Sequence, residues 1–170
     1  DTMLIRNVEP NAAHKKLAGL ENAGKLKAVV TQNIDGLHQK AGSKNVFELH
    51  GSIHRNYCTR CGKFFDAQYV KDTVGVPKCD SCGGLIKPDV VLYEEGLDNE
   101  VIEGAVRAIQ KADCLIIGGT SLVVYPAAGL IDYFSGDKLV LINKSTTSRD
   151  TNADLVIKAP IGEVFSKIKV

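Results

Sequence analysis

Four of the five cysteines in this 170-residue chain form two Cys-x-x-Cys pairs, and this spacing restricts the possible fold more than any other feature. The pairs are Cys58 with Cys61 and Cys79 with Cys82, and a glycine follows each pair. Each pair predicts a tight turn that points backbone amides at its sulfurs, and two such turns can surround one Zn²⁺ with four thiolates. Because four sulfur ligands leave no open position, we expect one structural Zn²⁺ per chain with no part in chemistry. Redox disulfides or an iron centre are the alternatives for this spacing.

Cysteine usage and charge also bear on the environment of the protein. The opening residues show no charged-then-apolar leader, so paired cysteines favour metal thiolates in a reducing, cytoplasmic compartment over disulfides. The longest apolar runs are shorter than the roughly eighteen residues of a spanning helix, and we expect no membrane association. A net charge of +1 gives no indication of direct nucleic-acid binding.

A second informative stretch runs from Thr31 to Ser52 and is rich in polar side chains capable of chemistry. Residues 27–30 before it predict a short buried strand, so the polar residues that follow would lie at a strand's carboxyl end, where open α/β sheets bind ligands. Residues 46–49 alternate like a second strand that ends at His50. The candidate site residues of this stretch are Gln32, Asn33, Asp35 and His50.

Each of these residues has an ordinary structural alternative. Asn33 and Asp35 are of the types that cap helices in strand-to-helix turns. A single histidine is more often structural than catalytic, and we expect a structural role for His38 on a short helix. His50 is the candidate general base, because imidazole titrates near neutral pH and can take a proton from a hydroxyl.

The motifs, taken in order, resemble the sirtuin family of NAD-dependent protein deacylases. They are Thr-Gln-Asn-Ile-Asp from Thr31, Glu-Leu-His-Gly from Glu48, the two cysteine pairs, Gly-Thr-Ser-Leu from Gly119 and Leu-Ile-Asn from Leu141. The family begins with a Gly-Ala-Gly-Ile-Ser turn and an Asp-Phe-Arg segment that hold the dinucleotide, and neither occurs in this sequence. We therefore expect the sequence as given to be a fragment that binds NAD⁺ weakly and turns over acyl-lysine peptide negligibly.

The resemblance implies an enzyme that transfers an acyl group from a protein lysine to the ADP-ribose of NAD⁺ and releases nicotinamide. Asn33 and Asp35 would act on the nicotinamide and the reacting ribose, Gln32 would orient the ribose, and His50 would be the general base. The other implied dinucleotide contacts are Gly118, Thr120, Ser121 and Asn143. The implied contacts of an acylated-lysine protein or peptide are Val91, Leu92, Tyr93 and Val124, through strand pairing. The family usually has Phe-Gly-Glu where this chain has Tyr93-Glu94-Glu95, so this chain lacks the family's glycine at position 94.

Alternation of strand-like and helix-like segments predicts an α/β fold, a Rossmann-like parallel sheet with a small four-cysteine module inserted. We assign residues 1–52 and 88–170 to the NAD-binding domain, with its N-terminal part missing, and residues 53–87 to the zinc module. Residues 113–121 predict a parallel strand buried on both faces, with Cys114 as a small core residue.

Two other functions remain open at this point. A sirtuin-like protein ADP-ribosyltransferase would use the same NAD⁺ site but pass ADP-ribose to a protein nucleophile. A non-catalytic zinc-containing binding fragment would leave Asn33, Asp35 and His50 unexplained. A hydride-transferring dehydrogenase is disfavoured, because no Gly-x-Gly-x-x-Gly follows a predicted strand.

Overall fold

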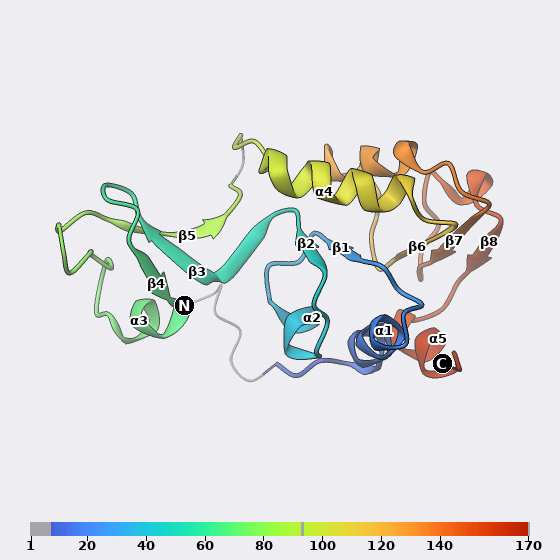
Figure 1. Cartoon of the computed structure of the whole chain (residues 1–170), viewed down its shortest axis with the longest axis horizontal. Helices are drawn as coiled ribbons and strands as arrows, with labels where there is room; N and C mark the ends of the chain where they lie inside the picture. Colours follow the sequence, from blue (N-terminus) through green and yellow to red (C-terminus); the bar gives the residue numbers. More distant parts are fainter. Residues whose placement is uncertain (1–7, 93, 170) are drawn as a thin grey trace.

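The parallel strands of the protein fall into two sheets. The computed structural model describes residues 8–92 and 94–169. β1 (Val29–Thr31) pairs in parallel with β2 (Val46–Glu48). In the second sheet β7 (Lys138–Ile142) lies between β6 (Cys114–Gly118) and β8 (Leu155–Ile157), again in parallel. The predicted α/β fold with parallel sheets is confirmed (Figure 1).

Helices cover both faces of these sheets (Figure 1). On one face, α4 (Asn99–Gln110) and the 3₁₀ helix η1 (Ala127–Tyr133) share a core with Leu49 and with partly buried residues of β1, β2 and β6. On the other face, α1 (Ala12–Asn22) and α5 (Ile161–Ser166) pack through Ala13 and Phe165 against Ile142 of β7. The fold is therefore layered, helix on sheet on helix.

Local sequence explains where the two long helices begin. The side chain of Asp98 accepts hydrogen bonds from the amides of Glu100 and Val101, which caps α4. Asn11 caps α1 with His14 in a reciprocal capping box, and Pro10 directly precedes this cap. Two short helices complete this part, α2 (Leu37–Lys40) and the 3₁₀ turn η2 (Asp150–Asn152).

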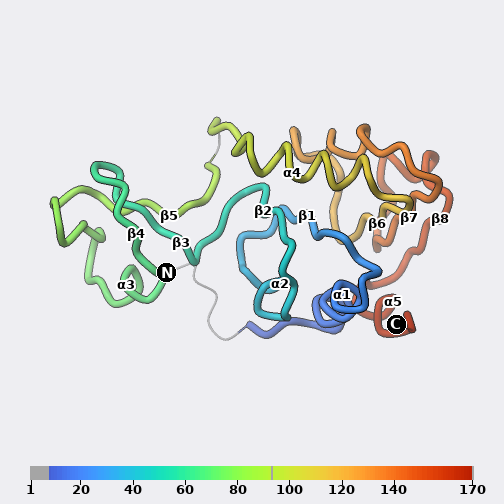
Figure 2. Tube along the Cα trace, in the orientation of Figure 1, coloured from blue at the N-terminus to red at the C-terminus, as the bar shows by residue number. Residues whose placement is uncertain are grey.

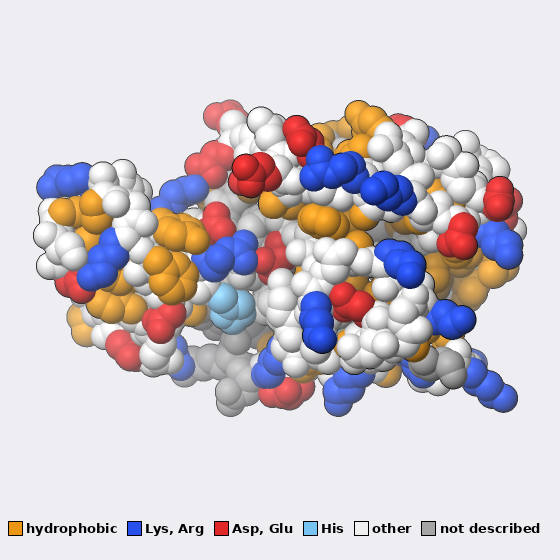
Figure 3. All heavy atoms as spheres, viewed as in Figure 1, with side chains coloured by type: hydrophobic (Ala, Val, Ile, Leu, Met, Phe, Trp, Pro, Cys, Tyr) orange, Lys and Arg blue, Asp and Glu red, His pale blue; other side chains and the backbone are white. Residues whose placement is uncertain are grey.

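The zinc module is built on an antiparallel sheet with the order β4, β3, β5. These strands are β3 (Gly51–Cys58), β4 (Phe64–Asp66) and β5 (Ile86–Val90), and α3 (Ala67–Asp72) follows β4. The tube trace shows the module at one end of the molecule (Figure 2). In the space-filling view the molecule narrows between the module and the parallel sheets (Figure 3). β3 begins directly after His50 and therefore joins the two parts.

The prediction of a strand buried on both faces, with Cys114 in the core, was wrong. Cys114 is exposed, and β6 is only partly buried, because it has β7 as its single strand partner among residues 8–92 and 94–169. β5 ends at Val90 because its last residue pair with β3 is Gly51 with Val90, so Val91 and Leu92 lie after the strand. Val124 lies in a bend with no strand partner in the described chain.

Two further predictions concern the chain as a whole. Every helix of the described ranges is too short or too polar to serve as a transmembrane segment. The domain boundaries at 52/53 and 87/88 stay a prediction. β3 runs across the first boundary, and β5 runs across the second.

Candidate functional site

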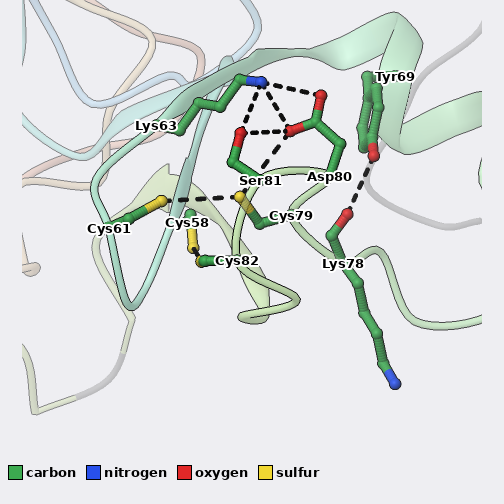
Figure 4. Close-up of polar contacts among 9 residues, drawn as sticks. All are labelled: Cys58, Cys61, Lys63, Tyr69, Lys78, Cys79, Asp80, Ser81 and Cys82. Carbon is green, nitrogen blue, oxygen red and sulfur yellow. Dashed lines mark hydrogen bonds and ion pairs between the residues drawn. The ribbon is translucent and has the colours of Figure 1, made fainter.

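The four paired cysteines converge on one point. The Sγ atoms of Cys58 and Cys82 are 3.4 Å apart, those of Cys61 and Cys79 are 3.6 Å apart, and all four lie within 4.8 Å of one another (Figure 4). A tetrahedral Zn²⁺ with bonds of about 2.3 Å would space its sulfurs by about 3.8 Å. The cluster therefore fits a structural Zn²⁺, as the spacing predicts.

The pKa values of the clustered thiols also indicate a site for a cation. Backbone amides of Cys61 and Arg60 donate to the Cys58 sulfur and lower the pKa of this thiol to about 6. The Gly84 amide lowers the pKa of Cys82, but the neighbouring thiols outweigh it and raise this pKa to about 12. Four sulfurs this close cannot all ionise unless a metal neutralises them. Lys63 lies beside the cluster and pairs with Asp80 at 2.6 Å (Figure 4).

His50 lies at the carboxyl end of β2, next to the segment that follows β1. Its Nδ1 is 3.0 Å from the carbonyl oxygen of Gln32. A carbonyl only accepts, so Nδ1 carries a proton, and in the neutral ring Nε2 then has a lone pair. The pairing of β1 with β2 continues into this region through a bond from the Leu49 amide to the Thr31 carbonyl. The structure thus brings His50 and Gln32 together, and His50 has the tautomer of a general base.

The segment after β1 forms a turn held by its own polar groups. The Asn33 amide donates to the Thr31 hydroxyl at 3.1 Å, and the Leu37 amide donates to Oδ1 of Asp35 at 3.0 Å. Asp35 therefore closes an Asx turn immediately before α2, whose N-cap is Gly36. The remaining oxygen of its carboxylate can still accept a hydrogen bond. Asn33 is exposed.

His38 lies on α2, as expected, and packs against α1. Its ring centroid is 4.6 Å from that of His14. Burial is the largest influence on both rings, and it lowers the pKa of each below the usual value for histidine. Nδ1 of His38 is buried, and no described residue bonds to it.

The second group of predicted residues lies at the carboxyl ends of β6 and β7. Nδ2 of Asn143 donates to the Thr120 carbonyl at 2.9 Å, and the Thr120 hydroxyl accepts from the Leu122 amide at 3.2 Å. A Cβ on Gly118 would lie 2.3 Å from the Ile161 side chain, so this glycine allows α5 to pack on β6. Ser121 is exposed. The structure connects Thr120 with Asn143, whereas the Ser121 side chain bonds to no other described residue.

The predicted acyl-lysine segment follows β5. The Val91 amide donates to the His50 carbonyl at 3.1 Å, so this segment is attached directly to the candidate base. Leu92 is exposed, and Tyr93 lies outside the described residues. Glu94 has φ of 70°, which is the left-handed conformation that glycine favours. The backbone of this turn therefore keeps a glycine-like shape without glycine.

A cavity of about 370 Å³ borders the same segment. It lies between β3, β5 and the start of α4, and its lining includes Tyr57, Lys87, Val91 and Glu95. Lys87 pairs with Glu95 at 2.9 Å across it, and Glu95 also accepts from the Leu92 amide. The loop after Val91 is thus held in shape by Glu95.

Sequence reasoning missed the role of residues 53–55 in β3. The Ile53 amide donates to the Ile34 carbonyl, and His54 Nε2 lies 2.9 Å from the Asp35 carbonyl. Arg55 pairs with Glu48 and with Asp89. These partners are distant in sequence, so no local pattern could have predicted them. Gly36 was the nearest signal, because a Cβ there would lie 2.7 Å from the His54 ring.

Comparison with known proteins agrees with this arrangement. The Sir2 family model matches residues 1–126. A protein of Clostridium acetobutylicum named NAD-dependent protein deacetylase is 65% identical over 169 residues, which is 99% of this chain and 69% of that protein. The protein of the same name from Clostridium perfringens is 65% identical over 98% of this chain and 68% of its own length.

Solved structures give the same result. A Sir2 complex with a p53 peptide and NAD⁺ superposes with a TM-score of 0.88 at 42% identity, over 94% of this chain and 69% of that one. Family model, curated relatives and fold therefore agree, and the chain belongs to the Sir2 family.

Proposed function

We propose that this protein is an NAD⁺-dependent protein lysine deacetylase, which transfers the acyl group of a modified lysine to ADP-ribose and releases nicotinamide. The observation that carries the proposal is the setting of His50. Its Nδ1 is fixed by Gln32, its Nε2 keeps a lone pair, and its backbone carbonyl is bonded to Val91 of the predicted acyl-lysine segment. The similarity to proteins named NAD-dependent protein deacetylase supports the same activity.

Two groups of residues would bind the two ends of NAD⁺, one group after β1 and β2 and the other at the carboxyl ends of β6 and β7. When bound, NAD⁺ supplies the ADP-ribose that accepts the acyl group and the nicotinamide that leaves. We assign Asn33 and Asp35 to the nicotinamide end and Gln32 to orientation of the ribose. His50 would take a proton from a ribose hydroxyl at Nε2. Gly118, Thr120, Ser121 and Asn143 would bind the other end of the dinucleotide.

The acylated lysine would approach along the loop after β5. An extended peptide can pair its backbone with a neighbouring strand or loop, so Val91, Leu92, Tyr93 and Val124 are the proposed contacts. Zn²⁺ on the four cysteines would hold the zinc module and take no part in the reaction, because no coordination position is open. We also propose a cytoplasmic location, since free thiolates persist in a reducing compartment, and no direct contact with nucleic acid or membrane.

The test is a product analysis with NAD⁺ and an acetyl-lysine peptide, made on the protein extended upstream by the family's Gly-Ala-Gly-Ile-Ser and Asp-Phe-Arg segments, because the sequence as given is expected to turn over the peptide negligibly. A deacetylase yields deacetylated peptide, nicotinamide and O-acetyl-ADP-ribose in equal amounts by mass spectrometry. An ADP-ribosyltransferase yields instead a peptide or protein that has gained ADP-ribose. A preparation that consumes no NAD⁺ and leaves the peptide acetylated would contradict the proposal.

A further inference from the structure

The contact between β3 and β5 is interrupted immediately after His50. Gly51 pairs with Val90 and Ser52 with Asp89, and the next pair is Asn56 with Pro88. Residues 53–55 therefore have no counterpart on β5. A bulge of this kind bends a strand and leaves it without regular ladder hydrogen bonds. It lies where the chain passes from the parallel sheets into the zinc module. Arg55 still pairs with Asp66 of β4, but none of the three residues pairs with β5, so contacts other than the β3–β5 ladder must fix the position of β5 there.

Arg55 is the bulge residue that supplies this fixation. Its Nη1 lies 2.7 Å from Oε2 of Glu48, and its Nε lies 2.8 Å from Oδ2 of Asp89. Glu48 belongs to β2 and stands two residues before His50. Asp89 belongs to β5 and stands two residues before Val91. One guanidinium thus joins the strand that carries the candidate base to the strand that leads into the predicted acyl-lysine segment.

The burial of Glu48 makes this arrangement more than a surface ion pair. The Glu48 side chain is only 7% exposed, whereas those of Arg55 and Asp89 are 39% and 43% exposed. A buried carboxylate requires a close cation, and Arg55 pairs with it at bonding distance. The planar fork of arginine can serve two carboxylates at once, which the single ammonium of lysine does less well.

The two other residues of the bulge bind the turn after β1. The Ile53 amide donates to the Ile34 carbonyl at 3.1 Å, and the His54 ring is bonded to the Asp35 carbonyl. The bulge therefore contacts the turn assigned to nicotinamide, the strand that ends at His50 and the strand that leads to Val91. No other three consecutive residues described above contact all of these parts.

We propose that Arg55 is a positioning residue that sets the acyl-lysine segment relative to His50 through its paired bonds to Glu48 and Asp89. The inference rests on the proposed deacetylase function and deepens it. Loss of the Asp89 bond would let the segment after β5 shift against His50, and small misplacements of this kind are costly to a reaction. NAD⁺ binding would be affected much less, because its proposed contacts do not depend on β5.

Asp89→Asn is the primary test, because it weakens only the β5 side of the arrangement and leaves buried Glu48 paired. We expect kcat/KM for an acetyl-lysine peptide to fall about tenfold, because a shift of the substrate segment relative to His50 disturbs the geometry of the reaction. KM for NAD⁺ and the melting temperature should change little, since the Asp89 side chain is substantially exposed. Arg107→Met, which removes the exposed Arg107–Glu103 pair of α4, is the matched control and should leave both substrates unaffected.

A double variant separates positioning from stability. Arg55→Met alone leaves the buried carboxylate of Glu48 without a cation and should lower the melting temperature. Glu48→Gln combined with Arg55→Met removes both charges of this pair and should recover most of the melting temperature. If Arg55 positions the peptide, the double variant still shows the reduced kcat/KM for peptide. Arg55→Lys should recover activity in part.

The outcomes distinguish this inference from the proposed function. If the upstream-extended protein without substitutions fails to deacetylate the peptide with NAD⁺, the proposed function fails and the positioning role with it. If the unmodified protein is active but Asp89→Asn and the double variant keep kcat/KM for peptide within about twofold, the function stands and Arg55 has only a structural role. A rise in KM for NAD⁺ together with a fall in melting temperature, in step with the loss of kcat/KM for peptide, would also overturn the positioning role.

Discussion

The backbone carbonyl of His50 accepts a hydrogen bond of 3.1 Å from the amide of Val91. The candidate base and the first residue of the predicted acyl-lysine segment are therefore neighbours through the backbone, whatever their side chains do. Replacing either side chain leaves this bond in place. Variants of His50 should consequently report on chemistry and not on the position of the substrate segment.

Replacing Cys79 by Ser should release zinc. The purified protein is expected to contain one Zn²⁺ per chain, and loss of one thiolate weakens binding and folding together. Metal analysis and thermal unfolding measure both effects. Cys114→Ser is the matched control, because Cys114 lies on β6 and outside the cluster. Folded protein without zinc, or equal zinc loss in both variants, would contradict the assignment.

His50→Ala should reduce the rate of deacetylation by roughly 10² to 10⁴ while zinc content and melting temperature stay unchanged. Asn33→Ala should in addition slow the exchange of labelled nicotinamide into NAD⁺, because it acts at the earlier step. His14→Gln on α1 is a control histidine substitution that keeps a capping-box residue type. Full activity of His50→Ala would show that another group is the base.

Gly51→Ala should destabilise the protein by roughly 3 kcal/mol or more, because the new Cβ would lie 1.9 Å from the Asp89 carbonyl oxygen. Gly24→Ala separates this clash from backbone strain, since Gly24 has a similar φ of 71° and nothing within 4 Å. Its cost should be about 1 kcal/mol. Urea unfolding of both variants gives the comparison, and equal losses would mean that β5 can move away from Gly51.

Glu94→Gly should raise the stability by roughly 0.5–1 kcal/mol, because it relieves a non-glycine residue of positive φ. The same substitution at Glu103 should lower stability by about 1 kcal/mol, because Glu103 lies within α4. Thermal unfolding of the two variants measures the opposite signs. A loss of stability in Glu94→Gly would mean that the Glu94 side chain contributes more than its backbone costs.

Acidification should destabilise the packing of α1 on α2. Burial is the largest influence on His14 and His38 and lowers the pKa of both in the folded state below the value of about 6.5 for an exposed histidine. The unfolded chain then binds more protons, so this contribution is complete above about pH 6.5 and is lost as the pH falls through the folded pKa values. In His38→Gln the melting temperature should depend less on pH below 6.5 than in Lys15→Gln. Identical pH dependence in both would contradict this.

Local features of the sequence predicted local features of the structure well. Strands form at residues 29–31 and 46–48, where two were expected, and His38 lies on the expected short helix. Asp98 caps α4 with a residue type that favours this position. These features depend on periodicity and on capping chemistry within a few residues. The four cysteines converge as their spacing predicts, because a metal site restricts geometry more strongly than propensity does.

Contacts between distant segments could not be predicted in the same way. The exposure of Cys114 depends on which strands lie beside β6, and the end of β5 depends on where β3 stops pairing with it. The pairing of Arg55 with Glu48 and Asp89 joins three strands, and no residue near Arg55 in sequence indicates it. The roles of the individual site residues stay a prediction for the same reason, because they depend on ligands and not on local pattern.

The single strand β3 carries Gly51, next to His50, at one end and the zinc ligand Cys58 at the other. We therefore expect metal occupancy and substrate binding to be coupled equilibria, although the cysteines and the loop after β5 are separate sites. A coupling free energy acts equally in both directions. An acetyl-lysine peptide bound at the loop after β5 should raise the affinity for zinc, measured by equilibrium competition with a chelator, by the same factor by which zinc strengthens binding of the peptide.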